Sequence, residues 1–244
     1  MGKTALITGG SRGIGAATAK YLAARGYGIC INYHANEQAA QTLVAQIKTE
    51  FQVPCIALRA DVSDEAQVVR LFADMDEQLA PVTHLVNNVG VLFKQMTVSD
   101  MDAERVNKIL ATNVTSYFLC SREAIKRMQP GCAIVNVSSV ASRTGSPGEY
   151  VDYAASKGAV DVLTRGLSLE LAGKGIRVNC VRPGFIYTDI HADGGEPGRV
   201  DRVSGQIPML RGGQPEEVAS AIAWLLSDEA SYVTGSFIDL AGGR

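Results

Sequence analysis

The order of apolar and amphipathic segments is the feature that most restricts the fold of this chain. Short apolar runs alternate with longer amphipathic stretches, a pattern typical of buried parallel strands connected by helices. Strands are predicted at Thr4–Ile7, Gly28–Asn32, Cys55–Leu58, His84–Val86, Ala133–Val137, Val178–Val181 and Ser236–Leu240. Helices are predicted at Ile14–Arg25, Glu37–Glu50, Ser63–Leu79, Met101–Met128, Tyr153–Ala172 and Pro215–Leu226. The alternation predicts an α/β fold in three layers (αβα), a doubly wound parallel sheet that binds ligands at the carboxyl ends of its strands.

Length and charge narrow the class of protein further. A chain of 244 residues, 46% of them apolar, can bury a substantial core, and no linker or change of composition divides it. We therefore expect one domain over residues 1–244. The 23 basic residues are scattered and the formal net charge is −2, which argues against nucleic acid as an obligate partner.

The apolar segments and the cysteines indicate the compartment. No apolar run approaches the roughly 20 residues of a membrane span, and residues 1–8 have the pattern of a strand rather than a signal peptide. We expect a cytoplasmic protein without membrane association. The cysteines stand singly, without a C-x-x-C pair, so we expect reduced, buried side chains and no metal site. They are Cys30, Cys55, Cys120, Cys132 and Cys180.

A glycine-rich turn follows the first predicted strand. Gly9, Gly13 and Gly15 lie between that strand and the first predicted helix. Such a turn lets the backbone approach a pyrophosphate at the amino end of a helix, where N–H donors and the helix dipole favour negative charge. The first gap, from Gly9 to Gly13, is wider than in the G-x-G-x-x-G pattern. The alternative is a tight connection that needs glycine only for its backbone conformation.

Tyr153 and Lys157 form a second candidate site. They stand four residues apart in a predicted helix, so they share one face, and Ser139 precedes Tyr153 by fourteen residues. An ammonium group beside a phenol favours the phenolate and lowers the pKa of the tyrosine, which suits proton transfer to or from a carbonyl oxygen. The alternative is a chance pairing on an ordinary helix.

These motifs, taken together, resemble those of the classical short-chain dehydrogenase/reductase family. Its order and spacing are matched by Thr8-Gly-x-x-x-Gly-x-Gly15, Asn87-Asn88-Val89-Gly90, Asn113, Ser138-Ser139, Tyr153-x-x-x-Lys157 and Pro183-Gly184, which cover essentially the whole chain. The resemblance implies a Rossmann-like fold and hydride transfer between NAD(P) and a secondary alcohol or carbonyl. Two departures are Val89, where the family usually has Ala, and one extra residue between Ser139 and Tyr153, which we place in the loop Arg143–Tyr150.

The resemblance implies a role for each of four catalytic residues. Tyr153 is the expected acid/base, and Lys157 is expected to lower the pKa of Tyr153 and to hold the nicotinamide ribose. Ser139 is expected to donate a hydrogen bond to the substrate oxygen. Asn113 is expected to anchor a water of the proton relay; alternatively, it is an ordinary polar residue of its helix.

The end of the second predicted strand bears on the choice of cofactor. In nucleotide-binding folds an acidic residue at this place binds the adenosine ribose and selects NAD. Here Asn32, Tyr33 and His34 carry no carboxylate, and the first acidic residue after the strand is Glu37. Arg12, in the glycine turn, stands where NADP-preferring members of similar sequence often keep a cation. NADP(H) is therefore favoured and NAD(H) is possible. Alternatively, Arg12 is a solvated charge and the site accepts both.

The remaining cofactor contacts are also implied by the resemblance. Asp61 and Val62 look like the pair that contacts the adenine, although Asp61 alternatively caps a helix that begins near Ser63. Residues 88–90 should line the adenosine ribose, and residues 183–188 should close over the carboxamide. The full predicted set is Gly9, Ser11, Arg12, Gly13, Ile14, Gly15, Asn32, Tyr33, His34, Asp61, Val62, Asn88, Val89, Gly90, Tyr153, Lys157, Pro183, Gly184, Ile186 and Thr188.

The segment 189–210 is rich in glycine, proline and charge, as expected of a mobile lid that carries specificity. Its polar residues favour a small polar carbonyl or a sugar, as in a glucose dehydrogenase; a 3-oxoacyl-thioester reductase is the alternative. A third hypothesis is a non-catalytic, NADP-sensing regulatory protein. That hypothesis predicts the loss of at least one of the four catalytic residues, and all four are present.

Apolar residues on two predicted helices indicate assembly. Met101–Met128 and Tyr153–Ala172 carry more apolar residues than one core-facing stripe needs. Similar proteins pair these helices across one two-fold axis and the last strand across another, which generates a D2 homotetramer. The alternative is a monomer whose apolar faces are covered by loops.

Overall fold

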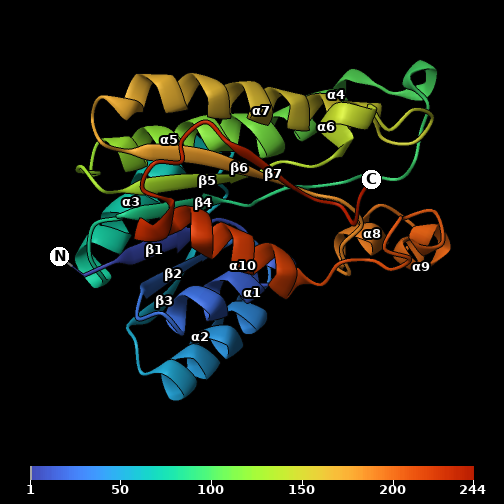
Figure 1. Cartoon of the computed structure of the whole chain (residues 1–244). Helices are drawn as coiled ribbons and strands as arrows, with labels where there is room; N and C mark the ends of the chain where they lie inside the picture. The colour runs from blue at the N-terminus through green and yellow to red at the C-terminus, as the bar shows by residue number, and fades with distance from the viewer. Residues whose placement is uncertain (1) are drawn as a thin grey trace.

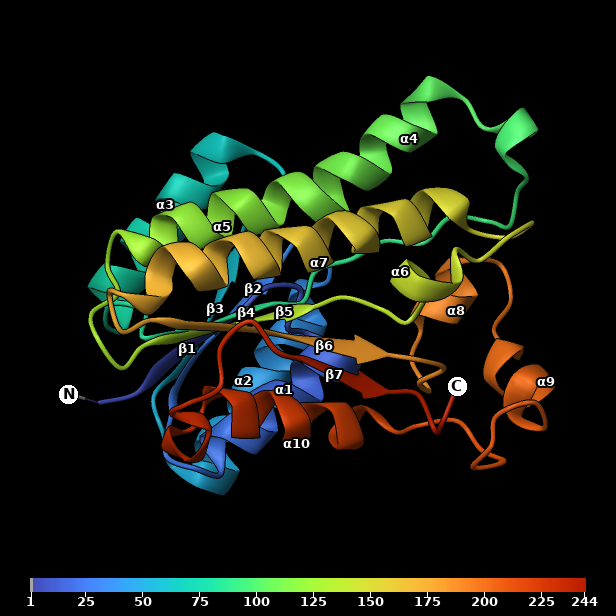
Figure 2. The ribbon, with the colours of Figure 1, turned by 45° about the horizontal axis from the view of Figure 1, so that its top comes forward.

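The computed structural model describes residues 2–244 and contains a parallel sheet with helices on both faces (Figures 1 and 2). The seven strands lie in the order β3-β2-β1-β4-β5-β6-β7. They are β1 (Thr4–Ile7), β2 (Gly28–Tyr33), β3 (Cys55–Arg59), β4 (His84–Asn87), β5 (Ala133–Val137), β6 (Arg177–Pro183) and β7 (Phe237–Leu240). The helices are α1 (Gly13–Ala23), α2 (Glu37–Phe51), α3 (Glu65–Gln78), α4 (Ala103–Leu110), α5 (Ser116–Ile125), α6 (Ala141–Thr144), α7 (Val151–Ala172), α8 (Ile190–Asp193), α9 (Arg199–Ser204) and α10 (Pro215–Leu226). The predicted three-layer, Rossmann-like α/β fold is confirmed.

The strands alternate their side chains between two apolar cores. On β1, Ala5 and Ile7 pack into the core shared with α1, α2 and α10, whereas Leu6 packs into the core on the opposite face with α3, α5 and α7. Figure 1 shows these two helical layers on either side of the sheet. Because both faces are covered, the strands are apolar on both sides, which explains their continuous apolar runs in the sequence.

The strand order reverses at the centre of the sheet. The chain moves outward from β1 through β2 to β3, returns to place β4 on the other side of β1, and then moves outward again to β7. A crevice opens at the carboxyl ends of the strands where the order reverses, and ligands of such sheets bind there. The predicted motifs after β1, β4, β5 and β6 all meet at this edge.

The single helix predicted over Met101–Met128 is wrong in detail. A 3₁₀ turn at Val98–Asp100 comes first, α4 starts only after Asp102, and a π-helical turn at Ala111–Thr115 separates α4 from α5. The later start follows from capping, because the Asp102 side chain accepts a hydrogen bond from the backbone N–H of Arg105. The periodicity of the sequence detects neither the cap nor the turn.

The start of α3 also differs from expectation. The cap is Asp64, whose side chain accepts from the backbone N–H of Gln67, so the helix begins at Glu65 rather than near Ser63. The alternative role of Asp61 as a helix cap is therefore wrong. Its carboxylate instead accepts from the backbone N–H of Ser63 at 2.9 Å and from the Ser63 hydroxyl at 2.7 Å, which closes a local turn.

Three further sequence expectations can be compared with the structure. All five cysteines are buried and free, which confirms that they act as apolar side chains. Within residues 2–244 no helix combines the length and the apolar character that crossing a bilayer requires. The predicted lid segment contains two short helices, α8 and α9, and buries the side chains of His191 and Arg199.

Candidate active site

A cavity of about 980 Å³ opens at the carboxyl edge of the sheet. It is lined by residues that follow β1, β2, β3, β4, β5 and β6 and by the first turns of α7. Of the predicted site residues it exposes Gly9, Ser11, Arg12, Gly13, Ile14, Asn32, Tyr33, His34, Asp61, Val62, Asn88, Val89, Gly90, Ser139, Tyr153, Lys157, Pro183, Gly184, Ile186 and Thr188. Gly15 and Asn113 do not line it. The fold thus brings nearly the whole predicted set together.

The glycine turn has the geometry that its glycines suggest. Gly9 and Gly13 have φ values of 59° and 53°, in the left-handed region that favours glycine. A Cβ at Gly15 would lie only 2.8 Å from the Asn88 amide nitrogen and from the backbone of Gly9 and Gly10. Gly15 is therefore needed for close packing of α1, which explains why it does not reach the cavity.

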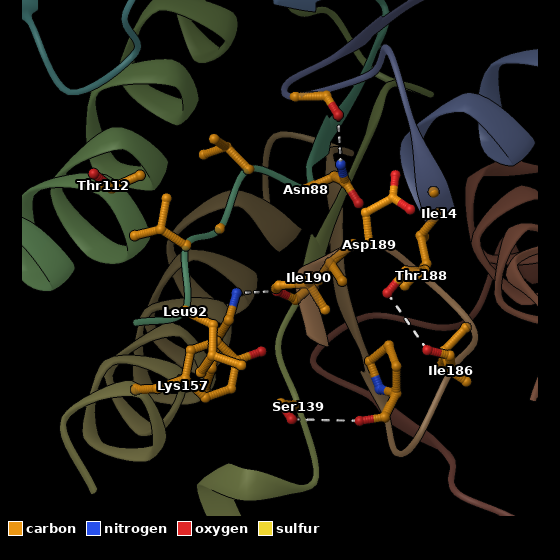
Figure 3. Close-up of a pocket in the computed structure, with 18 of the residues that line it drawn as sticks. Ile14, Asn88, Leu92, Thr112, Ser139, Lys157, Ile186, Thr188, Asp189 and Ile190 are labelled. Atoms are coloured by element: carbon orange, nitrogen blue, oxygen red, sulfur yellow. Dashed lines mark hydrogen bonds between the residues drawn. The ribbon is translucent and has the colours of Figure 1, made fainter. Parts of the chain in front are cut away.

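Polar side chains fix the glycine turn to its neighbours. The amide of Asn88 donates to the carbonyls of Thr8 at 3.0 Å and Gly9 at 3.2 Å. Figure 3 shows a dashed line for a hydrogen bond from the Asn88 nitrogen. From the other side, the Asn32 amide accepts from the backbone N–H of Gly9 and donates to the carbonyl of Ala60. The Asn88 and Asn32 side chains thus hold the turn in shape.

Arg12 lines the cavity and pairs with the lid segment. Its guanidinium donates to the carboxylate of Asp193 at 2.5 Å and lies 4.0 Å from Asp189. In the turn after β2, His34 lies 4.0 Å from the Asp61 carboxylate. The cation expected to meet a 2′-phosphate therefore has two carboxylates beside it in this structure.

Ser139, Tyr153 and Lys157, three of the four predicted catalytic residues, line the cavity, and Figure 3 labels Ser139 and Lys157 in it. The Ser139 hydroxyl donates a long hydrogen bond, 3.4 Å, to the carbonyl of Pro183 and accepts from the backbone N–H of Ala141. Tyr153 lies in the first turn of α7, and the Lys157 ammonium nitrogen is 5.7 Å from the centre of its ring. Thus the i, i+4 spacing places both groups on one face, as predicted.

Lys157 is predicted to lower the pKa of Tyr153, and in this structure burial of Tyr153 acts in the opposite sense. Burial raises the pKa of Tyr153 to about 12, against a smaller lowering effect of the Ser139 hydroxyl. Burial also lowers the pKa of Lys157 to about 8. The Lys157 ammonium directs its hydrogen bonds to the carbonyl of Val137 and the hydroxyl of Tyr117, at 2.8 and 3.2 Å, so a lowering of the Tyr153 pKa by Lys157 stays a prediction.

Asn113 lies in the π-helical turn and is fully buried. Its side chain accepts from the backbone N–H of Val91 and donates to the carbonyl of Val91 and to the hydroxyl of Ser156. The amide therefore ties the segment after β4 to α7. An effect of this side chain on the proton relay has to act through that positioning.

Several cavity residues were not found by sequence reasoning. Tyr150, which lacks a lysine four residues later, lines the cavity and donates to the carbonyl of Gly194. Arg199 is buried, pairs with Glu149 and Glu196, and lies 4.7 Å from the centre of the Tyr150 ring. The contacts of Tyr150 with Gly194 and of Arg199 with Glu149 join segments distant in the sequence, so spacing alone gave no signal for them.

Comparison with known proteins identifies the family. The family model described as Enoyl-(Acyl carrier protein) reductase matches residues 9–244. An Escherichia coli (strain K12) protein named "Uncharacterized oxidoreductase YgfF" is 65% identical, over 98% of this chain and 99% of its own. A 3-oxoacyl-[acyl-carrier-protein] reductase FabG of Staphylococcus aureus is 36% identical, over 100% of this chain and 98% of its own. The glucose and ribitol dehydrogenase of Daucus carota is 34% identical, over 100% of this chain and 85% of its own.

Solved structures agree with this result. A short chain dehydrogenase from Burkholderia cenocepacia J2315, in complex with NADP, superimposes with a TM-score of 0.93 at 32% identity. The match covers 100% of this chain and 98% of that chain. Sequence, fold and the constellation of Ser139, Tyr153 and Lys157 agree: the chain is an oxidoreductase of the short-chain dehydrogenase/reductase family.

Proposed function

We propose that this protein catalyses hydride transfer between NADP(H) and a carbonyl or secondary alcohol, with Tyr153 as the acid/base. The observation that carries the proposal is one continuous cavity that joins the glycine turn to the Ser139, Tyr153 and Lys157 side chains. The glycine turn suits a pyrophosphate, because its positive φ values and the amino end of α1 present backbone N–H groups. Nicotinamide, when bound, supplies or accepts the hydride.

The raised pKa of Tyr153 keeps its hydroxyl protonated at neutral pH. A phenol with a pKa of about 12 is protonated at neutral pH, so Tyr153 is ready to donate a proton to a carbonyl oxygen that gains negative charge. Ser139 can donate a second hydrogen bond to the same oxygen, because its present bond to Pro183 is long. The arrangement therefore supports carbonyl reduction at neutral pH.

NADP is the cofactor we propose, with NAD as a possible second choice. The turn after β2 offers no carboxylate before Glu37 to repel a 2′-phosphate, and Arg12 lies at the same end of the cavity. The Burkholderia cenocepacia structure of the same fold holds NADP. Arg12 has to leave at least part of its pairing with Asp193 to meet a 2′-phosphate.

The substrate is proposed to be a small polar carbonyl or a sugar. The cavity is also lined by the polar side chains of Glu149, His191 and Arg199, and Arg199 lies over the rings of Tyr150 and Phe185. The Daucus carota relative, named for glucose and ribitol, supports this choice. The Staphylococcus aureus relative, named for 3-oxoacyl-[acyl-carrier-protein] reduction, supports the alternative of a 3-oxoacyl thioester.

The proposal is tested with a panel of carbonyls and alcohols, followed by absorbance of NADPH or NADP, for the wild type and Tyr153→Phe. The variant loses only the hydroxyl, so we expect NADPH binding to remain and turnover to fall by about 100-fold or more. Tyr21→Phe is the control, because Tyr21 lies on α1 and does not line the cavity. Unchanged turnover in Tyr153→Phe would overturn the role of Tyr153. Tight NADPH binding without turnover on any substrate would favour the non-catalytic sensor instead.

We further propose a D2 homotetramer in the cytoplasm. Phe118 of α5 and Val162 and Leu169 of α7 are 52%, 74% and 73% exposed, which leaves an apolar face on the helix layer. Near β7, Trp224 and Tyr232 are also exposed. Free, buried cysteines are consistent with a reducing compartment. Light scattering distinguishes a mass of four chains from two, or from the 25.9 kDa monomer that would refute assembly.

A further inference from the structure

Tyr117, on α5, lies beneath the catalytic lysine and takes no part in the motifs described above. Its side chain is fully buried, and its hydroxyl contacts three partners. The Lys157 ammonium donates to it at 3.2 Å, and the carbonyls of Val137 and Val89 lie at 2.9 and 3.1 Å. Lys157 also donates to the carbonyl of Val137, at 2.8 Å.

The numbers of donors and acceptors give this hydroxyl a definite role. A phenol has one proton, so it donates to one of the two carbonyls at a time, and its lone pairs accept from the ammonium. An ammonium has three N–H groups. Two of those of Lys157 are directed to Val137 and Tyr117, which leaves one for a ligand in the cavity.

The same hydroxyl connects three segments of the active site. Val89 belongs to the turn after β4 that lines the cavity, and Val137 is the last residue of β5, immediately before Ser138 and Ser139. Tyr117 therefore holds the lysine in a fixed position relative to both segments. A phenylalanine in its place fills the same space without making any of these contacts.

We propose that Tyr117 is a positioning residue that keeps Lys157 charged and oriented in the active site, through the hydrogen bond its hydroxyl accepts from the ammonium. The proposal rests on the proposed function only in assigning Lys157 a part in the reaction. Hydrogen bonds to charged groups are stronger than those between neutral groups. The loss of this acceptor should therefore favour the neutral form of Lys157 over the charged form.

Burial makes the charge of Lys157 sensitive to such a loss. Burial already lowers the pKa of Lys157 to about 8. The titratable groups that face it are Asp161 and Tyr153 of α7, Cys180 of β6 and Tyr117 itself, whereas β5 and the turn after β4 contribute backbone atoms. Asp161 and Cys180 raise the pKa of the lysine. Neither is changed by substitution of Tyr117.

The decisive experiment follows the titration of Lys157 by NMR in protein labelled with ¹³C at the lysine ε-carbons. The Lys157 signal is the one that disappears in Lys157→Arg. In Tyr117→Phe we expect the midpoint to move by about 1–2 pH units toward acid, the size expected for one lost hydrogen bond to a charged group. Because the charged lysine is the functional form, the alkaline limb of kcat/KM and of NADPH affinity should move in the same direction.

Tyr27→Phe is the matched control. Tyr27 is also buried and has a lysine near its ring, since the Lys3 ammonium lies 5.7 Å from the ring centre, but the tyrosine hydroxyl to which Lys157 donates is that of Tyr117. Its loss should leave the Lys157 midpoint unchanged. If Tyr117→Phe does not fold, 3-fluorotyrosine at position 117 retains the hydroxyl but weakens it as an acceptor, and a smaller shift of the same sign is expected.

The outcomes separate this proposal from the proposed function. The role of Tyr117 is overturned if the titration midpoint of Lys157 is the same in Tyr117→Phe as in the wild type. If Tyr117→Phe does not fold, an unchanged midpoint in the fluorinated protein has the same meaning. A lower melting temperature without any shift has the same meaning, because it shows a structural role alone. If Lys157→Met keeps full turnover, the role of Lys157 in the proposed function fails, whereas the NMR titration still decides the role of Tyr117.

Discussion

Loss of Arg105 should weaken the fold and the active site together. The Arg105 guanidinium donates to the carboxylate of Asp152 at 2.7 Å, and the side chains of the pair are only 10% and 2% exposed. The other oxygen of Asp152 accepts from the backbone N–H of Tyr153 at 2.9 Å. The pair therefore ties α4 to the first turn of α7, where the proposed acid/base stands.

The expected size of the effect follows from this burial. Arg105→Ala leaves a buried carboxylate without its cation, a change that typically costs about 3–5 kcal/mol. For a chain of this length that cost corresponds to a fall in the melting temperature of about 6–20 °C. Displacement of Tyr153 should also lower kcat by about tenfold or more, with a smaller effect on KM.

The assay combines thermal unfolding with steady-state kinetics. Arg211→Ala is the control, because Arg211 pairs with Glu217 at 2.6 Å but both side chains are nearly half exposed, so a loss below about 1 kcal/mol is expected. Asp152→Asn combined with Arg105→Ala removes the unpaired charge and should recover part of the loss. A melting temperature for Arg105→Ala as high as that of the control would refute the energetic reasoning. A large loss of stability with unchanged kcat would show that the pair does not position Tyr153.

Three further predictions concern the cofactor, the substrate oxygen and pH. Arg12→Ala should weaken NADPH binding more than NADH binding, by about 1–3 kcal/mol, because only NADPH carries the 2′-phosphate. A fluorescence titration with each cofactor measures the difference, and equal losses would mean that Arg12 only shapes the turn. Ser139→Ala should lower kcat by about 100-fold with a small change in KM, because the Ser139 hydroxyl donates to a substrate oxygen that becomes charged in the transition state. A variant that changes KM alone would contradict this role. Burial, with the cations Lys3 and Arg177, lowers the pKa of His84 to about 4. In the unfolded chain His84 has its ordinary pKa near ~6.5, so the unfolded state binds the proton more readily than the folded state. The free energy of unfolding is therefore unaffected by His84 above pH ~6.5 and falls by about 3 kcal/mol as the pH drops toward ~4. Urea unfolding at several pH values measures this loss, which a flat profile between those limits would exclude.

The sequence predicted what depends on local pattern. The strands and most helices follow from the periodicity of the sequence. The glycine turn follows from its glycines, since Gly9 and Gly13 have positive φ values that favour this residue. Tyr153 and Lys157 came from i, i+4 spacing. Contacts between distant segments were not accessible in this way. Tyr117 meets Lys157 across forty positions, and Arg199 meets Glu149 across fifty. The burial that raises the pKa of Tyr153 is likewise a property of the whole fold, whereas the sequence pattern indicated only the nearby cation.

The π-helical turn at Ala111–Thr115 determines where this chain tolerates a change in length. A π turn holds one residue more than the α turn it replaces, so the helices on either side keep the phase of an α-helix that is one residue shorter. Deletion of a residue in the turn, other than Asn113, should restore α-helical geometry and leave α5 in place. The same deletion inside α5 would rotate every later side chain by about 100°. Homologous chains of different length should therefore gain or lose a residue at this turn and keep residue 117 buried toward the lysine and residue 118 toward solvent.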